Sequence, residues 1–112
     1  MSISSQKTAH DISLISVTGR LDQSQVADLE KAINEAIQQD EHDIVIDLSN
    51  ANYINSGGLR CLVTGWRNVK QLQRNLVLCG LNERLQEIFE MVGFDQVFTI
   101  YPSQDTALKN HT

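Results

Sequence analysis

Short apolar segments rich in β-branched residues recur along the chain and predict the strands of a sheet. They cover residues 12–17, 43–48, 76–79 and 97–100. Residues 12–17 partly alternate between apolar and polar, as in a half-buried strand. Residues 43–48 are apolar on both faces, which is typical of a central strand in a covered sheet. The polar residues 49–52 that follow predict a turn.

Helical periodicity appears between the predicted strands. Apolar residues recur at i, i+3 and i+4 spacings after Asp22, after Ser56 and after Asn82. Asp22, with Gln25 three residues later, is the predicted N-cap of the first helix. Ser56 and Asn82 are the predicted N-caps of the next two, and Gly93 ends the third. The expected core-facing residues are Val26, Leu29, Ile33, Ala36 and Ile37, then Leu59, Leu62, Val63, Trp66 and Val69, then Leu85, Ile88, Phe89 and Val92.

The alternation of strands and helices predicts an α/β fold. We expect a single domain over residues 1–112, with a mostly parallel central sheet of four to five strands and about four helices. The last helix is short and begins at Ser103, directly after Pro102, the only proline.

Composition and charge narrow the functional classes. The 112 residues are 41% hydrophobic and 21% charged with a formal net charge of −5, as in an ordinary folded domain rather than a disordered acidic tail. The acidic balance argues against a nucleic-acid partner, since nucleic-acid-binding domains usually carry net positive charge. All apolar runs are far shorter than the ~20 residues of a membrane span, and the N-terminus lacks a signal-peptide pattern. A cytoplasmic protein without membrane contact is therefore expected.

Cysteine and histidine residues indicate neither a disulfide nor a metal site. Cys61 and Cys79 lie among apolar residues, so two buried, reduced thiols are favoured. His10, His42 and His111 are scattered, without the spacing of metal ligands.

Charge is unevenly distributed along the chain. Residues 22–47 contain eight acidic residues and one lysine, whereas residues 56–75 contain four basic residues and no acid. Arg60, Arg67 and Arg74 recur every seven residues and are expected on one side of the second helix. They form either an ordinary solvated helix face or one half of a charge-complementary protein surface.

The motifs of common enzyme classes are missing, so no catalytic residues and no cofactor are predicted. Residues 54–58 lack the first glycine of a nucleophile elbow, no P-loop sequence occurs, and Gly57-Gly58 lacks the third glycine of a dinucleotide-binding motif. Asp47 ends a predicted strand like the phosphate-accepting aspartate of a response regulator, but the accompanying acidic pair and lysine are absent. Asp47 is expected to anchor a turn instead.

Ser56 is distinctive because two glycines and a strongly amphipathic helix follow it. As the predicted N-cap, its hydroxyl would lie over backbone N–H groups that Gly57 and Gly58 leave uncovered. Such a helix start accommodates an anion through these groups and the helix dipole. Ser56 is therefore either a cap alone or a residue that can also carry a phosphate.

Three motifs together resemble a known family. They are Gly19-Arg20-Leu21-Asp22, Ile44-Val45-Ile46-Asp47-Leu48-Ser49 and Tyr53-Ile54-Asn55-Ser56-Gly57-Gly58-Leu59. Their order and spacing, continued through Met91-Val92-Gly93-Phe94 and Asp105-Thr106-Ala107-Leu108, are similar to the sulphate transporter and anti-sigma factor antagonist (STAS) domain. The resemblance covers essentially the whole chain.

This resemblance implies an anti-sigma factor antagonist, a non-enzymatic regulator. In that family the partner anti-sigma factor, itself an ATP-dependent serine kinase, phosphorylates the serine that follows an aspartate, and a PPM-type phosphatase removes the phosphate. The unmodified antagonist binds the anti-sigma factor and releases the sigma factor. The corresponding phosphoacceptor is Ser56, with Asn55 in place of the aspartate and Gly57 in place of a second serine or threonine.

The expected partner-binding surface surrounds the start of the second helix. Its residues are Asp22, Gln23, Asn52, Tyr53, Asn55, Gly57, Gly58 and Arg60. Tyr53 is equally compatible with burial. Two alternatives stand beside this interpretation. One is a STAS adaptor subunit of a transporter or other signalling complex that is never phosphorylated, and the other is an enzyme or phosphocarrier of the same fold class. The oligomeric state is not predicted.

Overall fold

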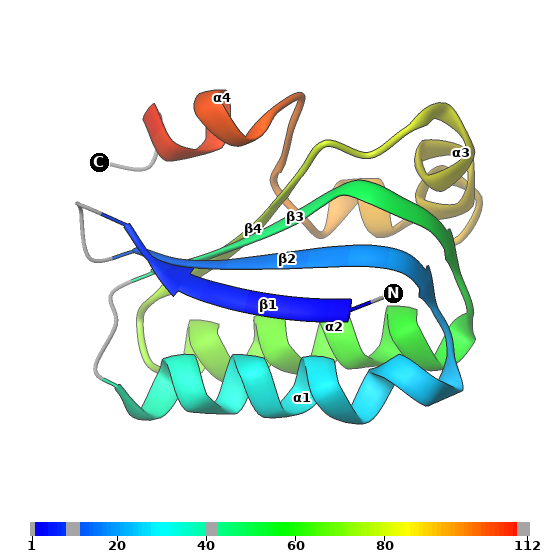
Figure 1. The fold of residues 1–112 in the computed structure, drawn as a ribbon. Coiled ribbons are helices and arrows are strands. Elements are labelled where there is room, and N and C mark those ends of the chain that lie inside the picture. The colour runs from blue at the N-terminus through cyan, green and yellow to red at the C-terminus, as the bar shows by residue number, and fades with distance from the viewer. Residues whose placement is uncertain (1, 9–11, 40–42, 110–112) are drawn as a thin grey trace.

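The computed structural model describes residues 2–8, 12–39 and 43–109, which form a five-stranded sheet and four α-helices (Figure 1). The strands are β1 (Ser2–Lys7), β2 (Ile12–Leu21), β3 (Asp43–Ile54), β4 (Asn75–Cys79) and β5 (Ile100–Tyr101). The α-helices are α1 (Gln23–Gln38), α2 (Ser56–Gln71), α3 (Glu83–Met91) and α4 (Gln104–Lys109), and a 3-10 helix η1 covers Phe94–Gln96. The predicted α/β class is confirmed.

The central strand of the sheet is β3. The strand order is β1-β2-β3-β4-β5, with β1 antiparallel to β2 and every other neighbouring pair parallel. Ile44, Val45 and Ile46 are all buried, as predicted for a strand covered on both faces. Because three of the four neighbouring strand pairs are parallel, the prediction of a mostly parallel sheet is confirmed.

Helices cover both faces of this sheet. In Figure 1, α1 and α2 lie side by side against one face, and α4 lies on the opposite face. The larger apolar core fills the space between the sheet and α1, α2 and α3, and a smaller one joins the strands to Ala107 of α4. Trp66, Phe89, Phe94 and Phe98 meet edge to face with ring centroids 6.0 to 6.4 Å apart. These aromatic contacts hold α3 and η1 beside α2.

The two longest strands extend further than the apolar pattern indicates. The turn predicted at residues 49–52 is wrong, because β3 continues to Ile54. Ala51 and Ile54 are buried and pair with β2, and two register shifts between the strands accommodate the irregular polar pattern. No apolar pattern indicates β1, because Ile3 is its only large apolar residue.

The end of the chain also differs from the prediction. The strand predicted at residues 97–100 is wrong in its extent, since β5 begins only at Ile100. The N–H of Phe98 donates to the carbonyl oxygen of Phe94 at 3.0 Å, which closes one α-type turn directly after η1. Phe98 is buried through the aromatic cluster instead of through strand pairing.

Side-chain caps begin the helices, with one correction to the sequence-based assignment. Asp22 and Asn82 cap α1 and α3 as predicted, each through a side-chain oxygen that accepts a backbone N–H. Asn55, not Ser56, is the N-cap of α2. Gly93 follows α3 with a φ of 79°, in the left-handed region that favours glycine. Among the described residues, no helix is long and apolar enough to cross a membrane.

Two polar side chains depart from expectation. Gln25, expected to assist the cap of α1, is buried, and its Oε1 has no hydrogen-bond partner among the described residues. Arg74 does not lie on α2, which ends three residues earlier, and its Nη1 donates to the carbonyl oxygen of Ile37 at 3.1 Å. Arg60 and Arg67 are on α2 as predicted, and both are exposed.

Two cysteine thiols and the carboxylate of Asp47 are buried in the domain. Cys61 and Cys79 are buried free thiols, as predicted. Burial raises the pKa of Cys61 to about 11 and that of Cys79 to about 12, so both thiols are neutral near pH 7.

The Oδ1 atom of Asp47 accepts hydrogen bonds from the N–H and the hydroxyl of Ser49, at 2.9 and 2.7 Å. Asp47 thus anchors the local backbone, although within a strand instead of a turn.

Candidate functional site

The candidate site lies where β2 and β3 end and where α1 and α2 begin. The N–H of Asn55 donates to the carbonyl oxygen of Leu21 at 3.2 Å and so ties the two strand ends together. Gly58 packs so closely that a Cβ atom there would lie 2.9 Å from Cγ1 of Ile54 and 3.0 Å from the backbone oxygen of Leu21. The first turn of α2 is thereby held against the strand ends, which positions Ser56.

The hydroxyl of Ser56 is exposed and does not hold the helix. The Oδ1 atom of Asn55 accepts the N–H of Gly58 at 2.9 Å, so the capping role expected of Ser56 belongs to its neighbour. Across the described parts of the chain, no residue forms a hydrogen bond with the Ser56 hydroxyl. It is therefore available at a helix start where negative charge is favoured.

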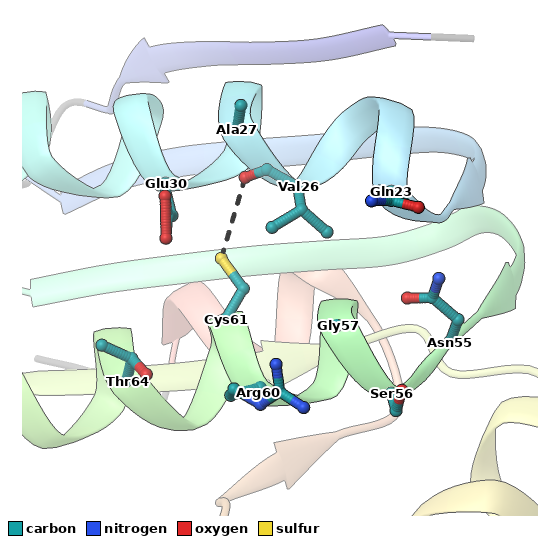
Figure 2. Close-up of a pocket in the computed structure, with 10 residues that line it drawn as sticks. All are labelled: Gln23, Val26, Ala27, Glu30, Asn55, Ser56, Gly57, Arg60, Cys61 and Thr64. Atoms are coloured by element: carbon teal, nitrogen blue, oxygen red, sulfur yellow. Dashed lines mark hydrogen bonds between the residues drawn. The ribbon is translucent and has the colours of Figure 1, made fainter.

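A groove of about 490 Å³ between α1 and α2, the α1–α2 groove, opens beside Ser56 (Figure 2). Sγ of Cys61 lies 4.0 Å from the carbonyl oxygen of Val26 across this groove. Glu30 on α1 and Arg60 on α2 give its two sides opposite charge. The lining residues are Gln23, Val26, Ala27, Glu30, Asn55, Ser56, Gly57, Arg60, Cys61 and Thr64.

A second groove, the α2–α3 groove, has a volume of about 320 Å³ and is mostly apolar. It is lined by Ser56, Leu59, Arg60, Val63, Val92 and Phe94. The sequence pattern predicts Val92 as a core residue, but it follows α3 as the C-cap and is 47% exposed. The adjoining Met91 is 82% exposed. Ser56 and Arg60 belong to both grooves, so the start of α2 separates a charged groove from an apolar one.

Arg20 connects two of the predicted interface residues. Its guanidinium carbon lies 4.2 Å from the centre of the Tyr53 ring, and its Nε lies 3.6 Å from Oδ2 of Asp22. Hydrogen bonds from the hydroxyl and N–H of Ser24, aided by Arg20, lower the pKa of Asp22. Sequence reasoning did not single out Arg20 as a site residue. Its position two residues before Asp22 in the first motif is the signal that could have identified it.

The structure brings most of the predicted interface residues to one end of the molecule, in two groups. Those that line the α1–α2 groove with Ser56 are Gln23, Asn55, Gly57 and Arg60. Asp22 and a half-buried Tyr53 meet at Arg20. Asn52 is exposed on β3 but lines neither groove, and Gly58 is buried.

The sequence predicts that the three histidines do not form a metal site, and the structure does not describe these histidines. His10, His42 and His111 lie outside the described residues. Within the described residues, no three His, Cys, Asp or Glu side chains are grouped so that they could hold a metal ion.

Comparison with known families decides the classification. The family model of the STAS domain matches residues 5–107. The chain belongs to the STAS domain family. The resemblance inferred from the three motifs is thereby confirmed, and the match spans every helix, with α4 reached in part.

Curated relatives of this STAS domain carry the names of anti-sigma factor antagonists. BtrV of Bordetella bronchiseptica, designated an anti-sigma factor antagonist, is 32% identical over 89 residues, which cover 80% of this chain and 77% of BtrV. The anti-sigma-B factor antagonist of Staphylococcus epidermidis is 29% identical over 93 residues, which cover 83% of this chain and 86% of that protein.

Solved structures share the architecture. An anti-sigma factor antagonist from Mycobacterium paratuberculosis is 27% identical with a TM-score of 0.85, covering 98% of this STAS domain and 94% of that chain. The anti-sigma factor antagonist SpoIIAA in its unphosphorylated form has a TM-score of 0.84 at 15% identity, covering 97% and 95%. The latter likeness concerns the fold alone.

Proposed function

We propose that this STAS domain is an anti-sigma factor antagonist, a regulatory protein rather than an enzyme. Unmodified, it binds an anti-sigma factor that is also a serine kinase, and phosphorylation of Ser56 by that partner ends the binding. The names of the curated relatives support the class of function. The observation that carries the switch is the exposed Ser56 hydroxyl, which the helix cap does not use.

The proposed reaction is a simple phosphoryl transfer at Ser56. The kinase moves the γ-phosphoryl group of ATP to Oγ of Ser56, the hydroxyl proton is lost, and ADP leaves. A PPM-type phosphatase later hydrolyses the ester, which releases inorganic phosphate and restores the hydroxyl. This chain supplies the acceptor oxygen and its position, and the partner enzymes supply the catalytic groups.

Phosphorylation changes the interface more than the fold. A phosphate adds about −1.5 to −2 charges and three acceptor oxygens. At the N-terminus of α2 this charge stabilises the protein mildly, by roughly 0.3–1 kcal/mol. In a complex the same phosphate must be desolvated against a surface shaped for a hydroxyl, which costs several kcal/mol. Since about 1.4 kcal/mol is a factor of ten, affinity falls by orders of magnitude while the domain stays folded.

The partner-binding surface that accompanies this proposal has three parts around Ser56. Polar residues of the α1–α2 groove, Arg60 above all, supply charge. The α2–α3 groove supplies apolar surface through Val92 and Phe94, and Arg20 stacked on Tyr53 supplies a semi-rigid edge. The residues that dominate binding energy in protein interfaces are often arginine or tyrosine, and they often lie in well-packed pockets. A cytoplasmic location accompanies a partner of this kind.

The experiment combines the purified protein with the anti-sigma factor kinase of the same bacterium, magnesium and ATP. Intact-mass and fragment spectra are expected to show one added phosphoryl group, on Ser56. Ser56→Ala is expected to bind the kinase and acquire no phosphate. Ser5→Ala, which removes an exposed serine of β1, is the matched control and is expected to be modified normally. A kinase that binds the wild type but phosphorylates another residue, or none, contradicts the switch.

A second candidate is a STAS adaptor that binds its partner without being phosphorylated. Asn55 favours it, because an uncharged amide stands directly before Ser56 where the family motif has a carboxylate. In the same experiment this adaptor would form a stable complex that magnesium and ATP leave unmodified.

A further inference from the structure

The two adjacent glycines of α2 differ in what the fold requires of them. A Cβ atom at Gly58 would lie 2.9 Å from Cγ1 of Ile54, closer than real Cβ atoms approach, and 3.0 Å from Cγ of Leu21, tighter than most real contacts. At Gly57 the nearest atoms to a Cβ would be Oδ1 of Asn55 at 3.4 Å and Cγ2 of Val26 at 3.8 Å, which are ordinary contacts. Of these two positions, the packing therefore requires glycine at 58 and not at 57.

Backbone conformation does not require glycine at position 57 either. Gly19, Gly80 and Gly93 have a positive φ, whereas Gly57 lies inside α2 with helical geometry. Alanine is a better helix former than glycine, because it loses less backbone entropy on folding. On grounds of stability alone, alanine would be the better residue at position 57.

A side chain at position 57 would enter the α1–α2 groove. Both atoms nearest to the added Cβ belong to residues that line this groove, Asn55 and Val26. Figure 2 shows Gly57 on the turn of α2 below Val26, between Ser56 and Cys61. A methyl group there would narrow the groove immediately beside the phosphoacceptor.

We infer that Gly57 lacks a side chain because the partner kinase closely covers this part of the α1–α2 groove. This inference rests on the proposed function. Phosphoryl transfer requires the reacting atoms to approach within about 3–3.5 Å, so a kinase acting on Oγ of Ser56 must cover its neighbours as well. Gly57 is the neighbour on the groove side, and its bare backbone lets the kinase approach there. It is thus a specificity-determining residue, since a side chain would exclude a partner shaped for its absence.

The test compares wild type, Gly57→Ala and Gly58→Ala by melting temperature and by calorimetric affinity for the purified anti-sigma factor kinase. Gly57→Ala is expected to melt at the wild-type temperature or a few degrees above it and to bind the kinase at least about tenfold more weakly, through the clash that the added methyl group creates. Gly58→Ala is expected to melt at a lower temperature, because Leu21 and Ile54 must shift.

Three outcomes would overturn the inference, and the melting temperatures and affinities distinguish them from one another. Wild-type affinity of Gly57→Ala shows that the kinase leaves this part of the groove uncovered. A large loss of melting temperature in Gly57→Ala shows that the fold itself needs the glycine. Failure of the wild type to bind the kinase overturns the proposed function, and the inference with it.

Discussion

Oδ1 of Asn55 accepts the N–H of Gly58 at 2.9 Å, so the residue that caps α2 is the one directly before the proposed phosphoacceptor. Two tasks at the helix start are thereby divided between neighbours. Asn55 satisfies a backbone donor that would otherwise lack a partner in the helix, and Ser56 keeps an exposed hydroxyl. A phosphate on Ser56 can then appear and disappear without removing the cap.

This division predicts unequal costs for two alanine substitutions. Asn55→Ala is expected to lower the free energy of unfolding by about 1 kcal/mol, because the N–H of Gly58 loses its acceptor. Ser56→Ala is expected to change it by less than about 0.5 kcal/mol, as for an ordinary surface residue. Urea denaturation at one protein concentration measures both. A larger loss for Ser56→Ala than for Asn55→Ala would restore Ser56 as the effective cap.

Arg60 is predicted to contribute to partner binding without contributing to stability. It is exposed, borders both grooves and is four residues after Ser56 on α2. Arg60→Glu is expected to weaken kinase binding by about tenfold or more through charge reversal at the interface, with the melting temperature nearly unchanged. Arg67→Glu, the same reversal two turns further along α2, is the control. Equal effects of the two variants would show that only net charge matters.

The apolar α2–α3 groove gives a second prediction about binding. Val92→Ser is expected to weaken kinase affinity, because it removes an exposed apolar surface beside Ser56. Leu72→Ser is a matched control, since Leu72 is 48% exposed, Val92 is 47% exposed, and Leu72 lies beyond the other end of α2. Calorimetry measures the affinity of both variants for the kinase, and only the Val92 variant is expected to bind more weakly. A loss of affinity in the Leu72 variant alone would assign the interface to the opposite end of the helix.

The two buried thiols predict how stability depends on alkaline pH. Their pKa values rise from 9.0 to about 11 for Cys61 and about 12 for Cys79, mainly through burial. The folded protein therefore keeps these protons at pH values where the unfolded chain releases them. By linkage, their contribution is complete below about pH 9 and is lost as the pH rises toward 11 and 12. Urea midpoints across this range are expected to fall less steeply in a Cys61→Ala/Cys79→Ala double variant than in wild type. An equally steep fall of the urea midpoint with pH in both proteins would contradict the raised pKa values of the two thiols.

Periodicity predicted the parts of the fold whose apolar residues repeat in regular spacing. The central strand around Val45 and the helical stripe through Leu62 and Val69 are both buried as expected. The polar segment 49–52 gave no comparable signal, because its place in β3 depends on pairing with β2, more than thirty residues earlier in the chain. For the same reason β1, whose side chains are mostly polar, is recognisable only once β2 is present beside it.

The structure gathers most of the residues predicted for the site at one end of the molecule, and it corrects which residue caps α2. Asn55 caps α2 because β3 continues to Ile54, which leaves Asn55 extended with φ −102° and ψ −179°. Neighbouring polar residues offered no local sign of where the strand ends. The contact between Arg20 and Tyr53 likewise depends on the register that places them opposite each other in the sheet.

The most direct test of the central claim is the affinity of the anti-sigma factor kinase for two forms of this protein, unmodified and phosphorylated on Ser56. Ser56→Asp serves as a permanent anion at the same position, and circular dichroism verifies that all three proteins are folded. We predict tight binding of the unmodified form and a loss of at least about a hundredfold in the phosphorylated form, since desolvating the phosphate costs several kcal/mol. Equal affinity of the folded unmodified and phosphorylated forms would contradict the account.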